Sequence, residues 1–383
     1  MIEQRSLLIF EQSIKSPATR KNYRDHLDRF LEYTRLKDYD ALVSVPTNQM
    51  ETILQDYVIY LKKTVNPNSV GTYMTGVKHF FTMNRVKIYW ELIQKLYPKL
   101  TKRSGAKSWT DKQIKQMIDF TPVKRNRAII HFLASTGSRV GVFDYPLQMR
   151  HLRNMEDNCK AVLLYAGEIE EYWAFLTPEA SNSLEEYFDE RQKDGEKFFE
   201  DTPVFRTTYR LGIEKAKQLS KNAVISMMFR IIRRAKIDRV RVNRNFDVQM
   251  DHGFRKRFNS ILKLNNAVNS NIAEKIMGHS VTIQLDNTYL PTHDPRVMAK
   301  CFEEFKKAMP ELTIDDTERK TYENMKLREE LSEKNKLFRD IEDLKLKFGR
   351  HEIERDELKA KMENRIKELE DKLKADRKNS DNS

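Results

Sequence analysis

The sequence reads HGFR at His252–Arg255, MGHS at Met277–Ser280 and TYL at Thr288–Leu290, and a distant upstream segment reads TGSR at Thr136–Arg139. These segments supply guanidinium groups, imidazoles and a phenol. A guanidinium can bind two phosphate oxygens at once, an imidazole can transfer protons, and a phenol can act as a nucleophile. The set predicts a site that breaks a phosphodiester bond without a metal ion.

Each side chain of this set has an expected role. Arg139 and Arg255 are predicted to bind the nonbridging phosphate oxygens, because arginine grips two oxygens and keeps its charge where negative charge develops. His252 could accept or shuttle the proton of the nucleophile, and His279 could donate to a phosphate oxygen. Tyr289 is the expected nucleophile, and with an ordinary pKa of about 10 it needs a base or positive surroundings.

Each motif also has a purely structural interpretation when it is taken alone. His-x-x-Arg is common on helices, where residues three apart share a face. Gly278 and His279 could be a glycine helix end followed by a satisfied histidine. Tyr289 could be a core aromatic, since it is one of 15 tyrosines. The functional interpretation depends on the joint order and spacing of the motifs.

In this order the motifs resemble those of the tyrosine recombinases, the phage-integrase-like enzymes of site-specific DNA recombination. The likeness rests on Thr136–Val140 and the three C-terminal segments, and Ser16–Tyr23 is similar to the opening of the family's N-terminal domain. It covers roughly residues 16 to 300. It implies a mainly α (α+β) fold: a SAM-like helical core-binding domain, followed by a catalytic domain with a small β-hairpin or sheet.

The resemblance also implies a mechanism. Arg139, His252, Arg255 and His279 would line the phosphate pocket. Tyr289 would form a covalent 3′-phosphotyrosyl link while a 5′-hydroxyl leaves. No cofactor and no metal are expected, because the covalent link keeps the bond energy for rejoining the strand.

Three positions depart from the family's pattern. The family has a hairpin lysine as general acid for the leaving oxygen, whereas residues 165–172 (YAGEIEEY) offer acids there. Lys160, at the start of the first strand, is the remaining candidate for that lysine. The interval from His279 to Tyr289 is one residue longer than the usual step. Val142 stands where the first box commonly has a glutamate.

The bulk composition favours DNA as a partner. The chain has 383 residues, a formal net charge of +13 and a pI near 9.4, which suits nucleic acid better than an anionic membrane surface. No run of about eighteen apolar residues could span a bilayer, and the first residues do not form an export signal. Cys159 and Cys301 are too few for a disulfide framework or a zinc site. We therefore expect a cytoplasmic, DNA-associated protein.

Periodicity and composition divide the chain into successive segments. They are a DNA-clamping domain of four helices at 1–100, a basic linker at 101–108, a catalytic domain at 109–312, a charged helix at 316–376 and a disordered tail at 377–383. The linker could wrap around a duplex or be a plain tether. Within the catalytic domain, residues 160–165 and 172–176 are the predicted strands of a hairpin.

The charged helix carries an apolar seam with alternating steps of four and three residues. The seam comprises Leu337, Ile341, Leu344 and Phe348, and it resumes with Leu358, Met362, Leu369 and Leu373. His351, Arg355 and Gly349 interrupt or weaken it. The pattern predicts a coiled coil that could strengthen assembly or recruit another protein, and a lone helix is the alternative.

A dense basic run precedes the HGFR segment. It comprises Arg230, Arg233, Arg234, Lys236, Arg239, Arg241 and Arg244. Such a run is expected to hold double-stranded DNA through its phosphates without reading the sequence, and a solvated helix face is the alternative. Because recombination joins two duplexes, we expect a homo-oligomer on DNA, a dimer or a tetramer. Residues 295–309 could be an amphipathic helix that docks on a neighbouring subunit or folds back on its own domain.

The sequence thus predicts a site-specific recombinase or integrase that cleaves and rejoins DNA strands. A type IB topoisomerase-like enzyme would use the same chemistry on one strand. A catalytically impaired DNA-binding relative would keep the arginines without turnover. A coiled-coil scaffold would explain the charged helix but not the ordered motifs.

Overall fold

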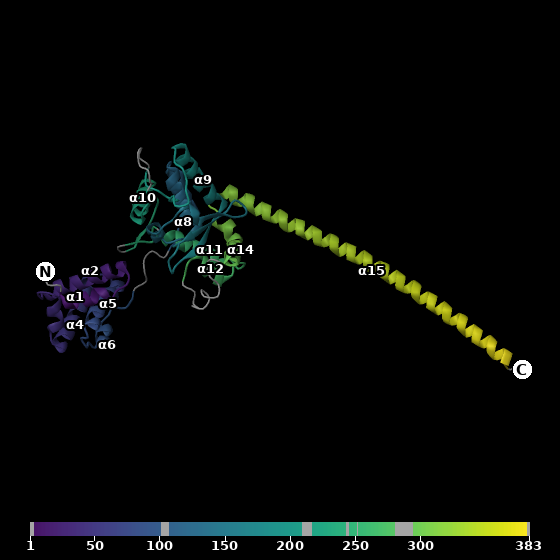
Figure 1. Ribbon diagram of the computed structural model, residues 1–383, viewed down its shortest axis with the longest axis horizontal. Coiled ribbons are helices and arrows are strands. Elements are labelled where there is room, and N and C mark those ends of the chain that lie inside the picture. Colours follow the sequence, from purple (N-terminus) through teal and green to yellow (C-terminus); the bar gives the residue numbers. More distant parts are fainter. Residues whose placement is uncertain are drawn as a thin grey trace. The chain divides into compact units, whose positions relative to one another are not determined.

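The computed structural model describes residues 4–100, 107–208, 217–242, 245–250, 252–279 and 294–380 (Figure 1). It divides into two units, Met1–Ala106 and Lys107–Ser383. Most of the predicted linker therefore lies outside the described residues, and each unit is considered by itself.

The first unit is a helical bundle, and its second helix has a capped start. The Ser16 side chain accepts a hydrogen bond from the Thr19 amide at 3.4 Å, and Pro17 is the first helical residue, as is typical of a capped helix start. The helices are α1 (Arg5–Gln12), α2 (Pro17–Thr34), α3 (Tyr39–Ser44), α4 (Thr47–Thr64), α5 (Val70–Met83) and α6 (Trp90–Lys95).

The predicted count of four helices for this unit is wrong. The described residues contain six α-helices and a short 3-10 turn, Pro67–Ser69. The two α-helices of six residues, α3 and α6, are too short to show an apolar period. The apolar residues of the longer helices do form the core, which includes Phe30, Leu54 and Phe80.

The second unit is mainly helical with a small sheet, as predicted. Its helices are α7 (Asp111–Phe120), α8 (Lys124–Thr136), α9 (Pro178–Lys193), α10 (Lys221–Arg234), α11 (His252–Leu264), α12 (Ser270–Ile276), α14 (Pro295–Leu312) and α15 (Asp316–Ser380). Two 3-10 turns, Val140–Asp144 (η2) and Met149–His151 (η3), follow α8. Helix α8 is the centre of the unit, since Ala128–Thr136 are all buried, and it packs against α7, α9, α11 and β3.

The sheet is antiparallel with the order β1-β2-β3. Strands β2 (Lys160–Leu164) and β3 (Tyr172–Leu176) are the predicted hairpin. Strand β1 (Leu152–Asn154) pairs with the other edge of β2, and the sequence did not reveal it because it has only three residues. Two-residue strands β4 (Arg241–Val242) and β5 (Asn245–Phe246) form a separate ribbon.

Helix α14 folds back on its own domain, which resolves one open alternative. Phe302 and Phe305 are buried and pack on Phe175 of β3, with ring centroids 5.4 Å apart in both pairs. It also packs against α11, α12 and the start of α15.

Helix α15 is 65 residues long. From Lys320 onward, every residue whose side chain is described is exposed. No helix in the described part of the chain has the length and apolar character needed to cross a membrane.

Candidate active site

The upstream arginine follows a tightly packed turn. Helix α8 ends at Gly137, whose φ is +56°. A β-carbon there would lie 2.6 Å from the side chain of Phe258 in α11, so the position needs glycine for both conformation and space. The Thr136 hydroxyl donates to the Phe132 carbonyl at 2.7 Å and accepts from the Ser138 amide at 3.2 Å. These contacts fix the backbone just before Arg139, whose own side chain is exposed.

Arg255 joins this turn to the third motif. Its guanidinium donates to the Gly137 carbonyl at 2.9 Å and to the Met277 carbonyl at 2.7 Å. The side chain is buried, with 7% of the residue exposed. Three segments that are far apart in the sequence therefore meet at one guanidinium.

The glycine of the third motif is also required by packing. Gly278 has a φ of +59° at the end of α12, and its amide donates to the Lys275 carbonyl. A β-carbon there would lie 2.2 Å from the ring of Tyr172, the first residue of β3. The site end of the hairpin thus packs directly against the motif that carries His279.

His279 is oriented by a carboxylate that the sequence analysis missed. Its Nδ1 is hydrogen-bonded to Glu274 of α12, and Glu274 also forms an ion pair with Lys263 of α11 at 2.5 Å. Burial alone would raise the pKa of Glu274, but its hydrogen bonds with Lys263 and His279 lower it below the ordinary value. Since Nδ1 is engaged, Nε2 is the ring nitrogen left for a ligand.

Arg139 and Arg255 act electrostatically on the same groups. Burial lowers the pKa of Arg255, and the positive charge of Arg139 lowers it further. Burial raises the pKa of Tyr172 to about 12, and the same two guanidiniums partly offset that rise. Burial likewise raises the pKa of Tyr165, again against the influence of Arg139. The two arginines therefore act on one pair of tyrosines at the end of the hairpin.

The second motif is placed by a tryptophan at the start of the unit. A β-carbon at Gly253 would lie 2.6 Å from the Trp109 ring. The Trp109 indole donates to the Met250 carbonyl at 2.9 Å, and its amide donates to the Gly253 carbonyl at 3.3 Å. His252, the first residue of α11, is exposed. Packing against Trp109 thus explains the glycine that follows His252.

Lys160 is engaged elsewhere. Its ammonium donates to Asn154 at 2.7 Å and forms an ion pair with Glu185 of α9 at 2.6 Å. It pairs with Leu176, at the end of the hairpin opposite Tyr172. At about 3.3 Å per residue, the four steps from Lys160 to Leu164 span roughly 13 Å of strand.

The structure describes Val142, the residue at the expected glutamate position, but not the expected nucleophile Tyr289. Val142, which stands where a glutamate was expected, is buried in the core of the unit. Tyr289 and Ser280 lie outside the described residues. The described geometry therefore concerns Arg139, Arg255 and the two histidines.

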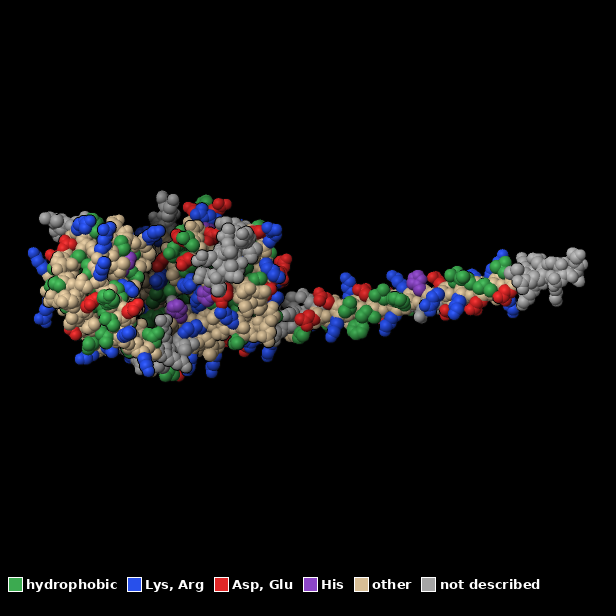
Figure 2. Space-filling model, turned by 90° about the horizontal axis from the view of Figure 1, so that it is seen from below, with side chains coloured by type: hydrophobic (Ala, Val, Ile, Leu, Met, Phe, Trp, Pro, Cys, Tyr) green, Lys and Arg blue, Asp and Glu red, His purple; other side chains and the backbone are tan. Residues whose placement is uncertain are grey.

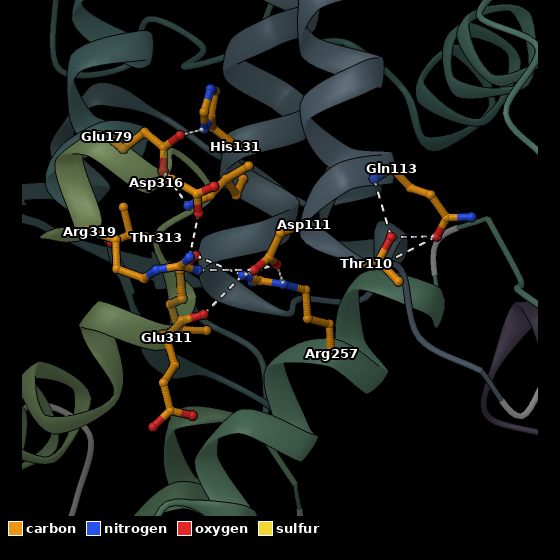
Figure 3. Close-up of polar contacts among 12 residues, drawn as sticks. Thr110, Asp111, Gln113, His131, Glu179, Arg257, Glu311, Thr313, Asp316 and Arg319 are labelled. Carbon is orange, nitrogen blue, oxygen red and sulfur yellow. Dashed lines mark hydrogen bonds and ion pairs between the residues drawn. The ribbon is translucent and has the colours of Figure 1, made fainter.

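Behind the site, α11 is tied to the junction of α14 and α15. Figure 3 shows Arg257, on the same helix as Arg255, directed at Asp111 of α7. Arg257 donates to Asp111 at 2.7 Å and to the carbonyls of Glu311 and Leu312 at 3.0 and 3.1 Å. Asp111 also meets Arg319 of α15 at 3.5 Å.

The basic run is mostly exposed. Arg230, Arg233 and Arg234 lie on α10, where positions three and four apart share a face. They and Lys236 and Arg241 are exposed. Arg239 is half-buried, with its guanidinium 4.0 Å from the Phe246 ring centroid, and Arg244 lies outside the described residues.

Sequence reasoning missed Glu274, Trp109 and Tyr172 as supports of the site. Glu274 lies five residues before His279, so a carboxylate one helical turn before a Gly-His motif was the available signal. Trp109 and Tyr172 carried no signal, since their contacts depend on glycines more than 100 residues away in the sequence.

Comparison with known proteins identifies the fold. No protein-family model matches the chain. No curated protein sequence is similar to it. The Tn1549 transposon integrase in complex with transposon right end DNA is 15% identical, over 78% of this chain and 99% of that chain, with a TM-score of 0.51.

The same integrase in complex with circular intermediate DNA is 17% identical, over 78% of this chain and 98% of that chain, with a TM-score of 0.51. A lambda integrase dimer bound to a core site is 13% identical over 73% of this chain and 90% of that chain, with a TM-score of 0.47. The match covers nearly all of the Tn1549 integrase chain in both structures. The chain therefore has the fold of the tyrosine recombinases, which the order of its motifs predicted.

Proposed function

We propose that this chain is a site-specific tyrosine recombinase that cleaves and rejoins DNA strands through a 3′-phosphotyrosyl intermediate. One observation carries the proposal: the Arg255 guanidinium binds the carbonyls of Gly137 and Met277. This contact joins the segments that carry Arg139 and His279. In the proposed site, the guanidiniums of Arg139 and Arg255 and the imidazole of His279 would act on one phosphate.

The chemistry assigned to the arginines follows from their different surroundings. Arg255 has two of its N–H donors on backbone carbonyls, so it keeps donors for a phosphate while its position is fixed. Arg139 is exposed, and it is free to close on a nonbridging oxygen. Preorganised charge of this kind stabilises the pentacoordinate transition state, where negative charge on the phosphate increases.

The two imidazoles have proposed roles in hydrogen bonding and proton transfer. His279, held through Nδ1 by Glu274, would present Nε2 to a phosphate oxygen. The phenolic oxygen of Tyr289 would bond to phosphorus as its proton leaves, with exposed His252 as the candidate acceptor. The bond from phosphorus to the 5′-oxygen would break, and that oxygen would take up a proton. Rejoining would be the reverse of these steps.

Covalent capture tests the proposal. Duplexes that bind the Tyr289→Phe variant would be selected from a random-sequence pool and rebuilt with a nick near the bound site, so that cleavage cannot be reversed. We expect the unaltered chain to form a protein–DNA adduct that survives denaturation, and Tyr289→Phe to form none. Tyr89→Phe, which removes an exposed phenol in the first unit, is the matched control. An adduct that persists in Tyr289→Phe would reject the assigned nucleophile.

A second candidate function is a DNA-binding relative with impaired cleavage. The engagement of Lys160 by Asn154 and Glu185 favours it, because the hairpin then brings no lysine to the leaving oxygen. Selected duplexes that bind tightly but yield no adduct with the unaltered chain would support this candidate. Relaxation of a supercoiled plasmid without recombinant products would instead indicate a topoisomerase-like enzyme.

A further inference from the structure

Helix α15 exposes an apolar seam that no other part of the described chain covers. The exposed seam residues are Leu337, Ile341, Leu344, Phe348, Leu358, Met362 and Leu369, each between 42% and 72% exposed. Figure 2 shows hydrophobic side chains recurring along this helix among alternating cationic and acidic ones. Exposed apolar residues at this spacing are typical of a helix that pairs with another helix.

We propose that residues 337–369 of α15 form a parallel, in-register coiled coil with the same helix of a second copy of this chain. The proposal goes beyond strand cleavage and does not depend on it. A heptad assignment follows from the alternating steps: Leu337, Leu344 and Leu358 take d positions, and Ile341, Phe348, Met362 and Leu369 take a positions. Four adjacent seam layers, from Leu337 to Phe348, are then apolar.

The charges beside the seam identify the second copy as the occupant. In a parallel in-register pair, each g residue faces the e residue five positions later on the partner. Asp340 then faces Lys345 of the other helix, and Glu354 faces Lys359. By sequence, Lys347 and Glu352 stand in the same relation. All three relations join opposite charges, and symmetry doubles each of them.

One polar layer of the seam fits this arrangement as well. Arg355 takes an a position, where the g residue of the other helix is its neighbour, and that residue is Glu354. Within one protomer Glu354 already lies 3.4 Å from His351. In the pair, Arg355 of one helix therefore lies beside the Glu354 carboxylate of the other.

An antiparallel pair fits less well. The antiparallel register that keeps the four apolar layers sets Glu333 against Glu354. A register that matches the flanking charges instead sets Leu344 against Arg355 and Phe348 against His351. That register breaks up the four adjacent apolar layers, so burial of the seam favours the parallel pair.

The seam lies well beyond the anchor of α15 on its own domain. Lys115 pairs with Asp315 at 3.1 Å, and the Ile314 amide donates to Glu179 at 2.8 Å. From Arg319, the last residue whose described side chain pairs with the domain, to Leu337 the helix rises about 27 Å at 1.5 Å per residue. Each protomer thus keeps a helical stem between its domain and the proposed pair.

Charge exchange in the full chain, without DNA, tests the pairing. Variant one carries Asp340→Lys and Glu354→Lys, and variant two carries Lys345→Glu and Lys359→Glu. We expect the unaltered chain to have the molar mass of a dimer at micromolar concentration by light scattering. Each variant alone should dimerise about tenfold or more weakly, since the two altered flanking pairs become repulsive while the pair of Lys347 and Glu352 is unchanged. Mixing the two variants should restore a dimer.

A matched control separates pairing from net charge. Asp343→Lys with Asp356→Lys makes the same charge change on the outer face of the helix, and it should leave dimerisation unchanged. For register, Ile341→Cys should form a disulfide between protomers on oxidation, whereas Arg339→Cys on the outer face should not. A monomeric unaltered chain would overturn the proposal and leave the seam to another protein. Failure of the mixed variants to pair, or equal loss in the control, would also overturn it, and absence of a disulfide in the Ile341→Cys variant would overturn the parallel register.

Discussion

At the scale of the residue, the two arginines of the candidate site have opposite surroundings. Arg255 is 7% exposed and makes two hydrogen bonds to backbone carbonyls. Arg139 is exposed and follows a turn that is held by other residues. The first arginine therefore supports the fold as well as the site, while the second is available for a ligand alone.

This contrast predicts different outcomes for the same substitution. Arg255→Lys keeps the charge but cannot span two carbonyls, so the free energy of unfolding should fall by about 1–3 kcal/mol. Arg139→Lys should change that free energy by less than about 0.5 kcal/mol. On DNA, Arg139→Lys should reduce strand cleavage more than affinity, because a point charge does not reproduce a bidentate fork. Urea denaturation and binding and cleavage assays measure these effects.

Equal losses of affinity and cleavage in Arg139→Lys would count against a role in the transition state. Arg230→Lys, on an exposed face of α10, is the control for the exchange itself. It should alter neither stability nor cleavage.

Gly278 offers a second prediction at this scale. Gly278→Ala should lower the free energy of unfolding by about 2–4 kcal/mol, because a β-carbon collides with the Tyr172 ring and φ is positive. Gly195 also has a positive φ, +86°, with nothing within 4 Å of an added β-carbon, and Gly195→Ala should cost about 1 kcal/mol. Calorimetry of both variants separates collision from backbone strain. Similar costs at the two glycines would contradict the packing argument.

At the scale of the element, the sequence predicted the elements that are long enough to show a residue pattern. It did not predict the short elements or the contacts between distant residues. The β2–β3 hairpin and the long charged helix α15 lie where their residue patterns predict them. Helices α3 and α6 and strand β1 have too few residues to repeat. The grouping of the motifs was predicted by their likeness to a family. The physical cause of that grouping could not be predicted. It is the contact of Arg255 with two carbonyls, whose residues are 118 and 22 positions away in the sequence.

A buried histidine between two of these elements predicts a pH dependence. Burial lowers the pKa of His131 in α8 to about 4, although the carboxylate of Glu179 in α9 lies 3.7 Å away (Figure 3). Its unfolded value is about 6.5. Between these values the unfolded chain binds a proton that the folded chain does not, so stability falls as pH falls from about 6.5 towards 4.

His131→Gln should remove this contribution, which has a slope of up to about 1.4 kcal/mol per pH unit. The measurement is the free energy of unfolding of both proteins at several pH values within that window. Parallel curves for the two proteins would show that His131 does not titrate between the folded and unfolded states.

At the scale of the whole molecule, the cations behind the net charge of +13 differ in whether they are paired with carboxylates. Apart from Arg255, the buried lysine and arginines that the structure describes form ion pairs: Arg191, for example, meets Glu196 at 2.6 Å. Arg230, Arg233 and Arg234, by contrast, are exposed on α10, and they form no ion pair with any carboxylate that the structure describes. Unpaired cations on one helix face suit a surface that neutralises DNA phosphates.

The last prediction follows from that surface. Each phosphate contact adds about 0.9 to the slope of log affinity against log salt for duplex DNA, so replacing all three arginines by glutamine should lower the slope by up to about 2.7. The loss should be similar for duplexes of unrelated sequence, because phosphate contacts carry no sequence information. Replacing exposed Lys193 and Lys197 by glutamine is the control and should leave the slope unchanged. If the triple variant keeps the full salt slope, α10 does not face the DNA, and its arginines are only a solvated surface.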